Sequence, residues 1–205
     1  MERLIILGAG GHGKVAADIA LKMGIYKTIA FLDDKVVGEC MDIPVLGEIN
    51  CAEKYISDSD LFIAVGNSRA REQIMTVLKE KGAKFATLIH PSANIGCKVK
   101  IGEGSMLAAG SVVNPCSDIG IGAIVNTKAS VDHDCIVGDF SHVSVGATVA
   151  GTVQIGNHVW IGAGATVINN VKITDDCMIG AGAVVVKNIC ESGTYVGVPA
   201  KRTEK

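Results

Sequence analysis

Valine occupies every sixth position, from Val125 to Val149, in the stretch VNTKASVDHDCIVGDFSHVSVGATV (residues 125–149). The spacing extends in both directions, so that an aliphatic residue occupies every sixth position from residue 95 to residue 185. The series comprises Ile95, Ile101, Leu107, Val113, Ile119, Val125, Val131, Val137, Val143, Val149, Ile155, Ile161, Val167, Ile173, Ile179 and Val185. Because Ile, Leu and Val make up only roughly a quarter of residues, this unbroken series does not arise by chance and is the primary structural signal.

A second series, four residues after each aliphatic position, contains only small residues. Its members are Val99, Ser105, Ser111, Ser117, Ala123, Ala129, Cys135, Ser141, Ala147, Val153, Val159, Ala165, Val171, Cys177 and Ala183. Glycine often follows the aliphatic residue directly, as at Gly96, Gly102, Gly120, Gly138, Gly156, Gly162 and Gly180. A period of six fits a coil in which each hexad is a short strand plus a corner. Three hexads close a triangular coil, and we expect these glycines to permit its turns.

Residues 89–205 are therefore predicted to form a parallel β-helix built from hexapeptide repeats. Successive coils stack as parallel strands, and the aliphatic side chains fill the interior. The left-handed winding comes from the known fold of such repeats and is an exception to the usual right-handed crossover.

Residues 1–88 have the pattern of a small Rossmann-like α/β domain. The expected strands are Leu4–Leu7, Thr28–Leu32, Leu61–Val65 and a segment near residues 84–89. Helical spacing predicts helices over residues 14–23 and about 70–81. Strands that alternate with helices imply a parallel sheet, with a ligand at the carboxyl ends of its strands.

A glycine-rich loop, Gly8-Ala9-Gly10-Gly11-His12-Gly13, follows the first expected strand and satisfies the pattern G-x-G-x-x-G. The match alone is weak, and a domain of about ninety residues leaves no second half for a nicotinamide. N–H groups at a helix N-terminus attract phosphate, and Asp33 and Asp34 could accept hydrogen bonds from a ribose or a base. The loop predicts a phosphorylated sugar or a nucleotide, and the alternative is a tight turn beside two solvated carboxylates.

Three histidines, His133, His142 and His158, lie in the repeat region outside both inward series, so they are expected on faces or corners. His133 precedes Asp134, and a carboxylate beside an imidazole fixes its tautomer and raises its basicity, which suits a general base. An exposed pair of this kind is also common on plain surfaces. His133 and His142 are half a coil apart, so they line one pocket only if a neighbouring subunit supplies one of them. His158 is expected on the surface, and Trp160 is expected to face outward.

Composition and charge exclude several function classes. With 48% hydrophobic and 20% charged residues the chain is globular, and its net charge of −2 gives no reason to expect nucleic acid or an acidic membrane. The seven cysteines are odd in number and lack C-x-x-C spacing, and no apolar run approaches a membrane span. We expect a cytoplasmic protein in which Cys135 and Cys177 are packed thiols rather than nucleophiles.

Six motifs occur in an order that resembles a known family. They are Gly8-Ala9-Gly10-Gly11-His12-Gly13-Lys14, Phe31-Leu32-Asp33-Asp34, Ala64-Val65-Gly66-Asn67, His133-Asp134-Cys135, Phe140-Ser141-His142-Val143-Ser144-Val145-Gly146 and Val196-Gly197-Val198-Pro199-Ala200-Lys201. Over essentially the whole chain this is similar to the bacterial hexapeptide-repeat sugar acetyltransferases, which include UDP-4-amino-sugar N-acetyltransferases of the bacillosamine type and a sialic acid O-acetyltransferase group. The resemblance implies acetyl-CoA as co-substrate, no metal, and the amine of a nucleotide-linked 4-amino sugar, first of all a UDP sugar, as acceptor. O-acetylation of sialic acid or another sugar hydroxyl is the alternative.

The resemblance also implies roles for individual residues. His133 matches the general base and Asp134 its supporting carboxylate. His142 and the main chain near Ala163 and Ala181 match positions that contact acetyl-CoA. The nucleotide-sugar site is matched by Gly10, Gly11, His12, Asp33, Asp34 and Gly66, and the segment 197–199 is expected near the adenine end of the cofactor. The family further implies a homotrimer with active sites between subunits.

The chain departs from the bacillosamine-type enzyme at Asp134, where that enzyme has glutamate. Because aspartate is one methylene shorter, its hydrogen bond to His133 is expected to be longer or to come from another angle. Two other classes fit parts of the pattern. One is a zinc hydratase of the trimeric prism type with His133, His142 and His158 as ligands, and the other is a structural or sugar-binding module.

Overall fold

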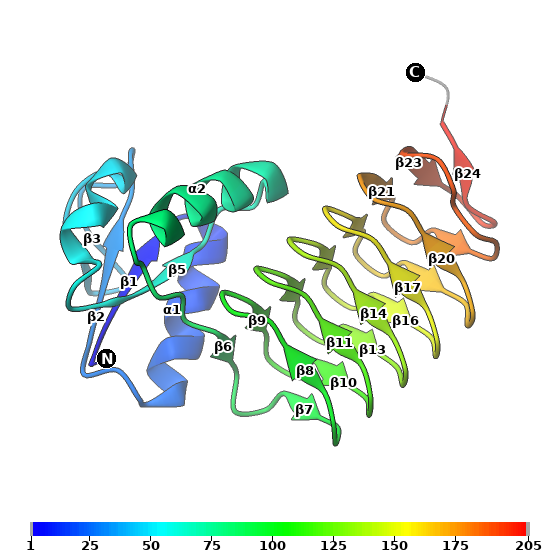
Figure 1. Ribbon diagram of the computed structural model, residues 1–205, viewed down its shortest axis with the longest axis horizontal. Coiled ribbons are helices and arrows are strands. Elements are labelled where there is room, and N and C mark those ends of the chain that lie inside the picture. The colour runs from blue at the N-terminus through cyan, green and yellow to red at the C-terminus, as the bar shows by residue number, and fades with distance from the viewer. Residues whose placement is uncertain (1, 204–205) are drawn as a thin grey trace. The chain divides into compact units, whose positions relative to one another are not determined.

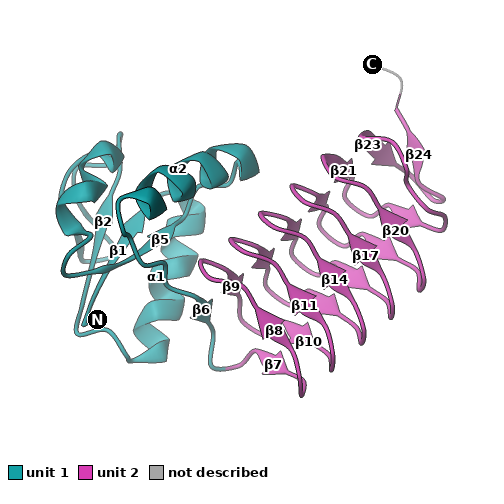
Figure 2. Cartoon of the chain, viewed as in Figure 1, with its two compact units in different colours: residues 1–91 teal, residues 92–205 magenta. Residues whose placement is uncertain are grey.

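The computed structural model describes residues 2–203, and the chain divides into two compact units, residues 1–91 and residues 92–205 (Figure 2). Unit 1 contains a sheet and its helices, and unit 2 consists of stacked short strands (Figure 1).

A five-stranded sheet forms the centre of unit 1. Its order is β3 (Gly38–Cys40), β4 (Ile43–Val45), β2 (Thr28–Leu32), β1 (Arg3–Leu7) and β5 (Asp60–Ile63). All neighbours pair in parallel except β3, which is antiparallel to β4. The helices are α1 (Gly11–Met23), α2 (Ser68–Glu80) and a 3-10 helix, Ile49–Tyr55. The carboxyl ends of β1, β2 and β5 therefore lie at one edge, where sheets of this type bind ligands.

Unit 1 differs from the sequence-based expectation in two places. Of the strand expected near residues 84–89, only a single bridge between Phe85 and Leu61 joins this sheet, and β6 (Leu88–Ile89) is not one of its strands. The hairpin of β3 and β4 was not predicted, because its strands are three residues long and mostly exposed and therefore carry no clear alternation.

Unit 2 is a left-handed parallel β-helix with three sheets as its faces (Figure 1). The first face contains β7 (Asn94–Ile95), β10 (Val112–Val113), β13 (Ser130–Val131), β16 (Thr148–Val149), β19 (Thr166–Val167) and β22 (Val184–Val185). The second contains β8 (Lys100–Ile101), β11 (Asp118–Ile119), β14 (Ile136–Val137), β17 (Gln154–Ile155) and β20 (Lys172–Ile173). The third includes β9 (Met106–Leu107), β12 (Ile124–Val125), β15 (His142–Val143), β18 (Trp160–Ile161), β21 (Cys177–Ile179), β23 (Gly193–Val196) and β24 (Lys201–Arg202).

The interior of the β-helix contains the two predicted series. From Leu107 to Val185, every aliphatic member is at most 3% exposed. The small series is buried from Ser105 to Ala183, and Cys135 and Cys177 are 1% and 2% exposed. At the start of the β-helix, Ile95 is 38% exposed and Val99 is half-buried. Partners in adjacent coils are eighteen residues apart, as for Val113 and Val131. The six-residue period is therefore confirmed as one side of a triangular coil.

The expected role of the glycines that follow the aliphatic residues is wrong. The turns are made two residues later, where every sixth residue from 98 to 182 has a positive φ, including Asp134 at 57° and Phe140 at 56°. Gly102 and Gly120 are needed for another reason. A Cβ at Gly102 would lie 2.5 Å from the nitrogen of Ile121, and one at Gly120 would lie 2.7 Å from the carbonyl carbon of Gly138. These glycines allow close approach of adjacent coils.

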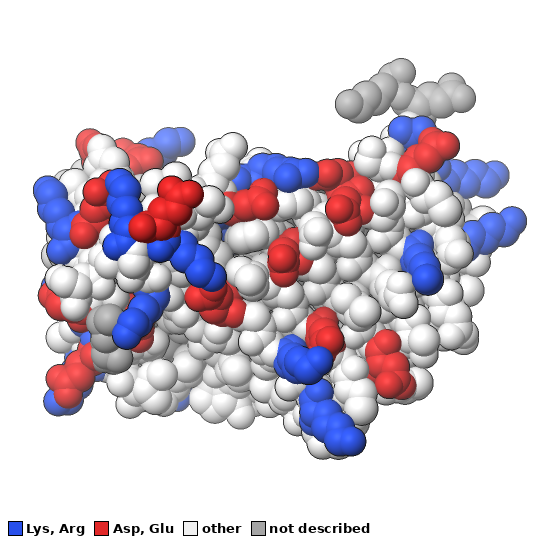
Figure 3. Space-filling view, viewed as in Figure 1, with Lys and Arg blue, Asp and Glu red and all other residues white. Residues whose placement is uncertain are grey.

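The surface carries charges of both signs. Lys, Arg, Asp and Glu are interspersed on the face shown in Figure 3, as expected for a net charge of −2. Among residues 2–203, no helix has both the length and the apolar character that a membrane span requires.

Candidate active site

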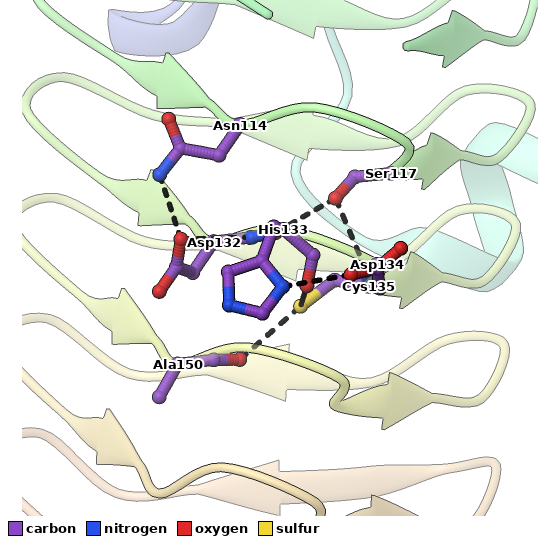
Figure 4. Close-up of polar contacts among 7 residues, drawn as sticks. All are labelled: Asn114, Ser117, Asp132, His133, Asp134, Cys135 and Ala150. Atoms are coloured by element: carbon purple, nitrogen blue, oxygen red, sulfur yellow. Dashed lines mark hydrogen bonds and ion pairs between the residues drawn. The ribbon is translucent and has the colours of Figure 1, made fainter. Parts of the chain in front are cut away.

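His133 lies at the corner between β13 and β14, directly beside Asp134 (Figure 4). Its Nδ1 lies 2.8 Å from Oδ2 of Asp134, and both side chains are more than half exposed. A carboxylate can only accept here, so Nδ1 carries the proton and Nε2 is left as the basic nitrogen. The hydrogen bond with Asp134 and the charge of Asp132 raise the pKa of His133 above its ordinary value. The ring can therefore take a proton from a group that approaches the corner.

The shorter side chain of Asp134 does not lengthen this hydrogen bond. The 2.8 Å distance is typical of a hydrogen bond to a charged group, so the expected lengthening is not found, and an approach from another angle stays a prediction. Asp134 occupies the position of the corner at which the backbone turns left-handed, and its φ is 57°. This turn brings its carboxylate back beside the ring of the preceding residue.

A second carboxylate, Asp132, flanks His133 and was not identified from the sequence. Its Oδ1 accepts hydrogen bonds from Asn114 Nδ2 at 2.7 Å and from the His133 N–H at 2.8 Å. The bonds from Asn114 and from that N–H lower the pKa of Asp132, so it remains ionised. Asn114 and Asp132 are eighteen residues apart, and this spacing could have revealed the pair.

Gly151, one coil further along, leaves room for the imidazole. A Cβ at Gly151 would lie 2.6 Å from Nε2 of His133 and 2.8 Å from Cε1. Residue 151 occupies the same corner position as His133, eighteen residues later. Only glycine therefore permits the ring to lie where it does.

His142 lies on the third face of the β-helix, whereas His133 lies at the corner between the other two faces. His142 belongs to β15, where its Nε2 lies 3.0 Å from Asn126 Nδ2 and its ring centroid lies 4.8 Å from that of Trp160. Trp160 is 39% exposed. Ala163 and Ala181 are exposed and follow β18 and β21, the next two strands of the same sheet. The structure thus groups the three predicted cofactor residues along one sheet and separates them from His133.

His158 lies at a corner and is half-buried. Its ring stacks on Phe140 with centroids 5.7 Å apart and planes 5° from parallel. Burial raises the pKa of Cys135 and of Cys177, which agrees with packed thiols rather than nucleophiles. Within residues 2–203, no group of three or more His, Cys, Asp or Glu side chains is placed to hold a metal ion.

In unit 1, the glycine-rich loop joins β1 to α1. Gly10 is the N-cap of α1, and no side chain caps this helix end. A Cβ at Gly10 or Gly11 would meet no atom within 4 Å, so the loop is open at these residues. Gly8 has a φ of 110°, and a Cβ at Gly13 would overlap the carbonyl oxygen of Gly8. The glycines of this pattern therefore allow a tight turn and leave the N-terminus of α1 accessible.

Asp33 and Asp34 bind main-chain N–H groups of their own unit. Asp33 Oδ2 accepts from the N–H of Ala9 at 2.7 Å, and its Oδ1 accepts from Lys35 and Val36 at 2.8 Å. Partial burial opposes ionisation, but these bonds prevail and lower the pKa of Asp33. Asp34 Oδ1 accepts from the Ile49 N–H at 2.9 Å. Neither acid is merely solvated, and both connect loops around the glycine-rich turn.

A buried cation, Arg71, lies behind this loop and was not identified from the sequence. It is 2% exposed, and its Nη1 donates to the carbonyl oxygens of Val65 at 2.8 Å and Gly66 at 3.2 Å. Burial lowers the pKa of Arg71 to about 10. Burial and the charge of Arg71 lower the pKa of His12 to about 4, so His12 is neutral at pH 7. Gly66 itself is exposed, next to the start of α2.

Comparison with known proteins agrees with this architecture. The family model for the PglD N-terminal domain matches residues 3–78, and that for the bacterial transferase hexapeptide (six repeats) matches residues 152–187. The curated UDP-N-acetylbacillosamine N-acetyltransferase of Bacillus subtilis is 34% identical over 113 residues. That match covers 53% of this chain and 52% of the relative, so the chain spans about half the length of this relative.

Solved structures match almost the whole chain, and two of them show the extent of the likeness. The acetyltransferase domain of PglB from Neisseria gonorrhoeae is 40% identical with a TM-score of 0.97, over 99% of this chain and 100% of that one. A variant of perosamine N-acetyltransferase from Caulobacter crescentus, in complex with CoA and GDP-perosamine, is 35% identical with a TM-score of 0.94. That match covers 98% of this chain and 97% of the other. The chain therefore belongs to the bacterial hexapeptide-repeat sugar acetyltransferase family.

Proposed function

We propose that this enzyme transfers the acetyl group of acetyl-CoA to the amine of a nucleotide-linked 4-amino sugar, with UDP as the first candidate nucleotide and His133 as general base. The observation that carries the proposal is the His133 ring, more than half exposed, whose Nδ1 lies 2.8 Å from the carboxylate of Asp134, so that Nε2 is the basic nitrogen. The relatives support the substrates, since one solved structure of the PglB domain contains acetyl-CoA and the perosamine enzyme contains CoA and GDP-perosamine.

In the proposed reaction the sugar amine attacks the thioester carbonyl carbon while His133 Nε2 accepts the proton that the nitrogen loses. The C–N bond forms and the C–S bond breaks. The leaving thiolate receives the proton from the imidazolium, which restores the base. The charges of Asp134 and Asp132 stabilise the imidazolium, and a main-chain N–H or His142 stabilises the oxyanion.

The nucleotide part of the acceptor is assigned to unit 1. The uncapped N-terminus of α1 at Gly10 and Gly11 offers N–H groups to the phosphates. Neutral His12, Gly66 and the loops held by Asp33 and Asp34 complete this candidate site. The two acids are proposed to shape the loops as well as to face the ligand.

The active enzyme is proposed to be a homotrimer with each site between two subunits. His133 of one subunit would face His142, Ala163 and Ala181 of the next. Within one chain these three residues lie along the third face, whereas His133 lies at the corner between the other two. Co-expressed His133→Ala and His142→Ala chains test this arrangement, since mixed trimers contain some sites with both histidines intact. Activity above that of either single variant is expected, and no recovery from trimers shown to be mixed would contradict shared sites.

The test of the chemistry is release of CoA thiol by the wild type and by His133→Ala. We expect turnover to fall by roughly two to four orders of magnitude while binding of the nucleotide sugar persists. His158→Asn serves as control, because asparagine tolerates the left-handed φ of 57° at this corner. Unchanged turnover of His133→Ala would remove His133 from the mechanism. Assays with UDP- and GDP-linked 4-amino sugars and with sialic acid identify the acceptor.

A further inference from the structure

We infer that Ser117, buried one coil before His133, is a positioning residue for the proposed general base. This inference rests on the proposed function. Ser117 is 0% exposed, and its hydroxyl donates to the carbonyl oxygen of Asp132 at 2.7 Å. The hydroxyl oxygen of Ser117 also accepts a hydrogen bond from the N–H of Cys135 at 3.1 Å. One buried hydroxyl therefore binds the main chain on both sides of His133 and Asp134 (Figure 4).

The main chain is the part of this corner that buried groups hold in place. The side chains of His133 and Asp134 are 57% and 59% exposed, so packing within the chain constrains them little. Their mutual geometry depends on the path of residues 132–135. Because Ser117 joins the two ends of that path from inside, it keeps the carboxylate within hydrogen-bond distance of Nδ1.

The same hydrogen bonds recur at a corner without a proposed catalytic group. Ser105 is 0% exposed, donates to the carbonyl oxygen of Gly120 at 2.6 Å and accepts from the N–H of Ala123 at 3.2 Å. Ser105 and Ser117 belong to the same small series, which contains alanine at five other positions. Replacement of either serine by alanine is therefore compatible with the fold and removes an equivalent pair of bonds. Ser105→Ala is a matched control for Ser117→Ala.

The first experiment compares turnover and its pH dependence in these two variants. Ser117→Ala is expected to lower kcat roughly tenfold, because a small misplacement of a catalytic group is costly. The apparent pKa of His133, read from the pH profile of this variant, should move down toward the ordinary histidine value, since the hydrogen bond between His133 and Asp134 is weakened. Ser105→Ala should lose as much melting temperature but keep the kcat and pH profile of the wild type. Equal kcat and equal profiles in the two variants would overturn the inference.

A second experiment does not depend on turnover. The pKa of His133, measured by NMR titration of its ring proton, should be lower in Ser117→Ala than in Ser105→Ala. If Ser117→Ala does not fold, Ser117→Cys and Ser105→Cys replace the pair, since cysteine occupies this series at Cys135 and Cys177. The thiol forms longer hydrogen bonds, so the pKa of His133 should again be lowered by Ser117→Cys and not by Ser105→Cys. Equal His133 pKa values in the two variants would refute the inference.

The two hypotheses fail in different ways. If His133→Ala keeps full turnover, the proposed base is wrong, whatever Ser117 does. If His133→Ala is inactive but Ser117→Ala behaves as Ser105→Ala does, only the positioning role is lost.

Discussion

His133 in unit 2 and His12 in unit 1 have opposite environments. His133 is exposed between two carboxylates, and the hydrogen bond with Asp134 and the charge of Asp132 raise its pKa. His12 is largely buried, and burial and the nearby Arg71 lower its pKa to about 4. At a given pH, His133 is therefore protonated to a greater extent than an ordinary histidine, and His12 to a smaller extent.

This difference separates two tasks. A ring whose basicity is increased by neighbouring carboxylates suits the acceptance of a proton. A ring that remains neutral has one donor and one acceptor nitrogen, which suits recognition of a polar ligand without exchange of charge. The β-helix corner is thus the better candidate for chemistry and the glycine-rich loop for binding.

The largest expected effect concerns His12 and stability. Unfolded chains protonate this histidine below an ordinary pKa of about 6.5, whereas the folded protein does so only near 4. The unfolded state then binds more protons, so the unfolding free energy falls between these pH values, by up to about 3 kcal/mol from this group. His12→Phe should lack this part of the decrease. Urea titrations at several pH values between 7 and 4 measure it.

His133 is expected to change the unfolding free energy with pH in the opposite direction. Its raised pKa stabilises the folded state below the ordinary value, and this contribution is lost as pH rises through the folded pKa. His133→Ala should therefore lose stability at low pH relative to the wild type, where His12→Phe gains it. Changes of the same sign in both variants would contradict the comparison.

Asp134→Asn should reduce kcat/KM by roughly a hundredfold, because an amide can favour the wrong tautomer of a neighbouring histidine. The pKa read from the pH profile should also fall, since the charge beside Nδ1 is removed. Asp176→Asn is a matched control, because Asp176 occupies the same corner position with a φ of 57°. A similar loss in both variants would indicate a general effect on the corners.

Gly151→Ala is expected to lower kcat roughly tenfold by displacing the imidazole, since its Cβ would lie 2.6 Å from Nε2. The measurement is a double-mutant cycle with His133→Ala. In that background the added methyl meets no ring, so Gly151→Ala should have no further effect on residual turnover. An equal loss in both backgrounds would show that Gly151 acts independently of His133.

The β-helix was predicted in most of its detail because each coil repeats the environment of the coil before it. Val131 and Val149 occupy equivalent inward positions, so a period in the sequence is a period in space. The role of the glycines could not be obtained in this way. At Gly102 glycine is required because adjacent coils approach too closely for a Cβ, and not because the backbone turns there. The sequence does not distinguish these two reasons.

The candidate sites were predicted less completely. His133 and Asp134 are adjacent in sequence, so their contact could be anticipated. The partnership of Asn114 and Asp132 follows from the eighteen-residue repeat but was missed. Arg71 could not have been found, because its burial depends on how α2 packs in unit 1 rather than on a local pattern.

Asp132→Asn should give the smallest change and the most specific one. The amide oxygen can still accept from Asn114 and from the His133 N–H, so the substitution removes the charge and keeps both bonds. Without that charge the pKa of His133 should move down. Because only the neutral ring accepts a proton, the rising limb of the kcat/KM profile should shift to lower pH, and the variant should be relatively more active on its acidic side. An unshifted limb would mean that Asp134 alone determines the basicity of His133.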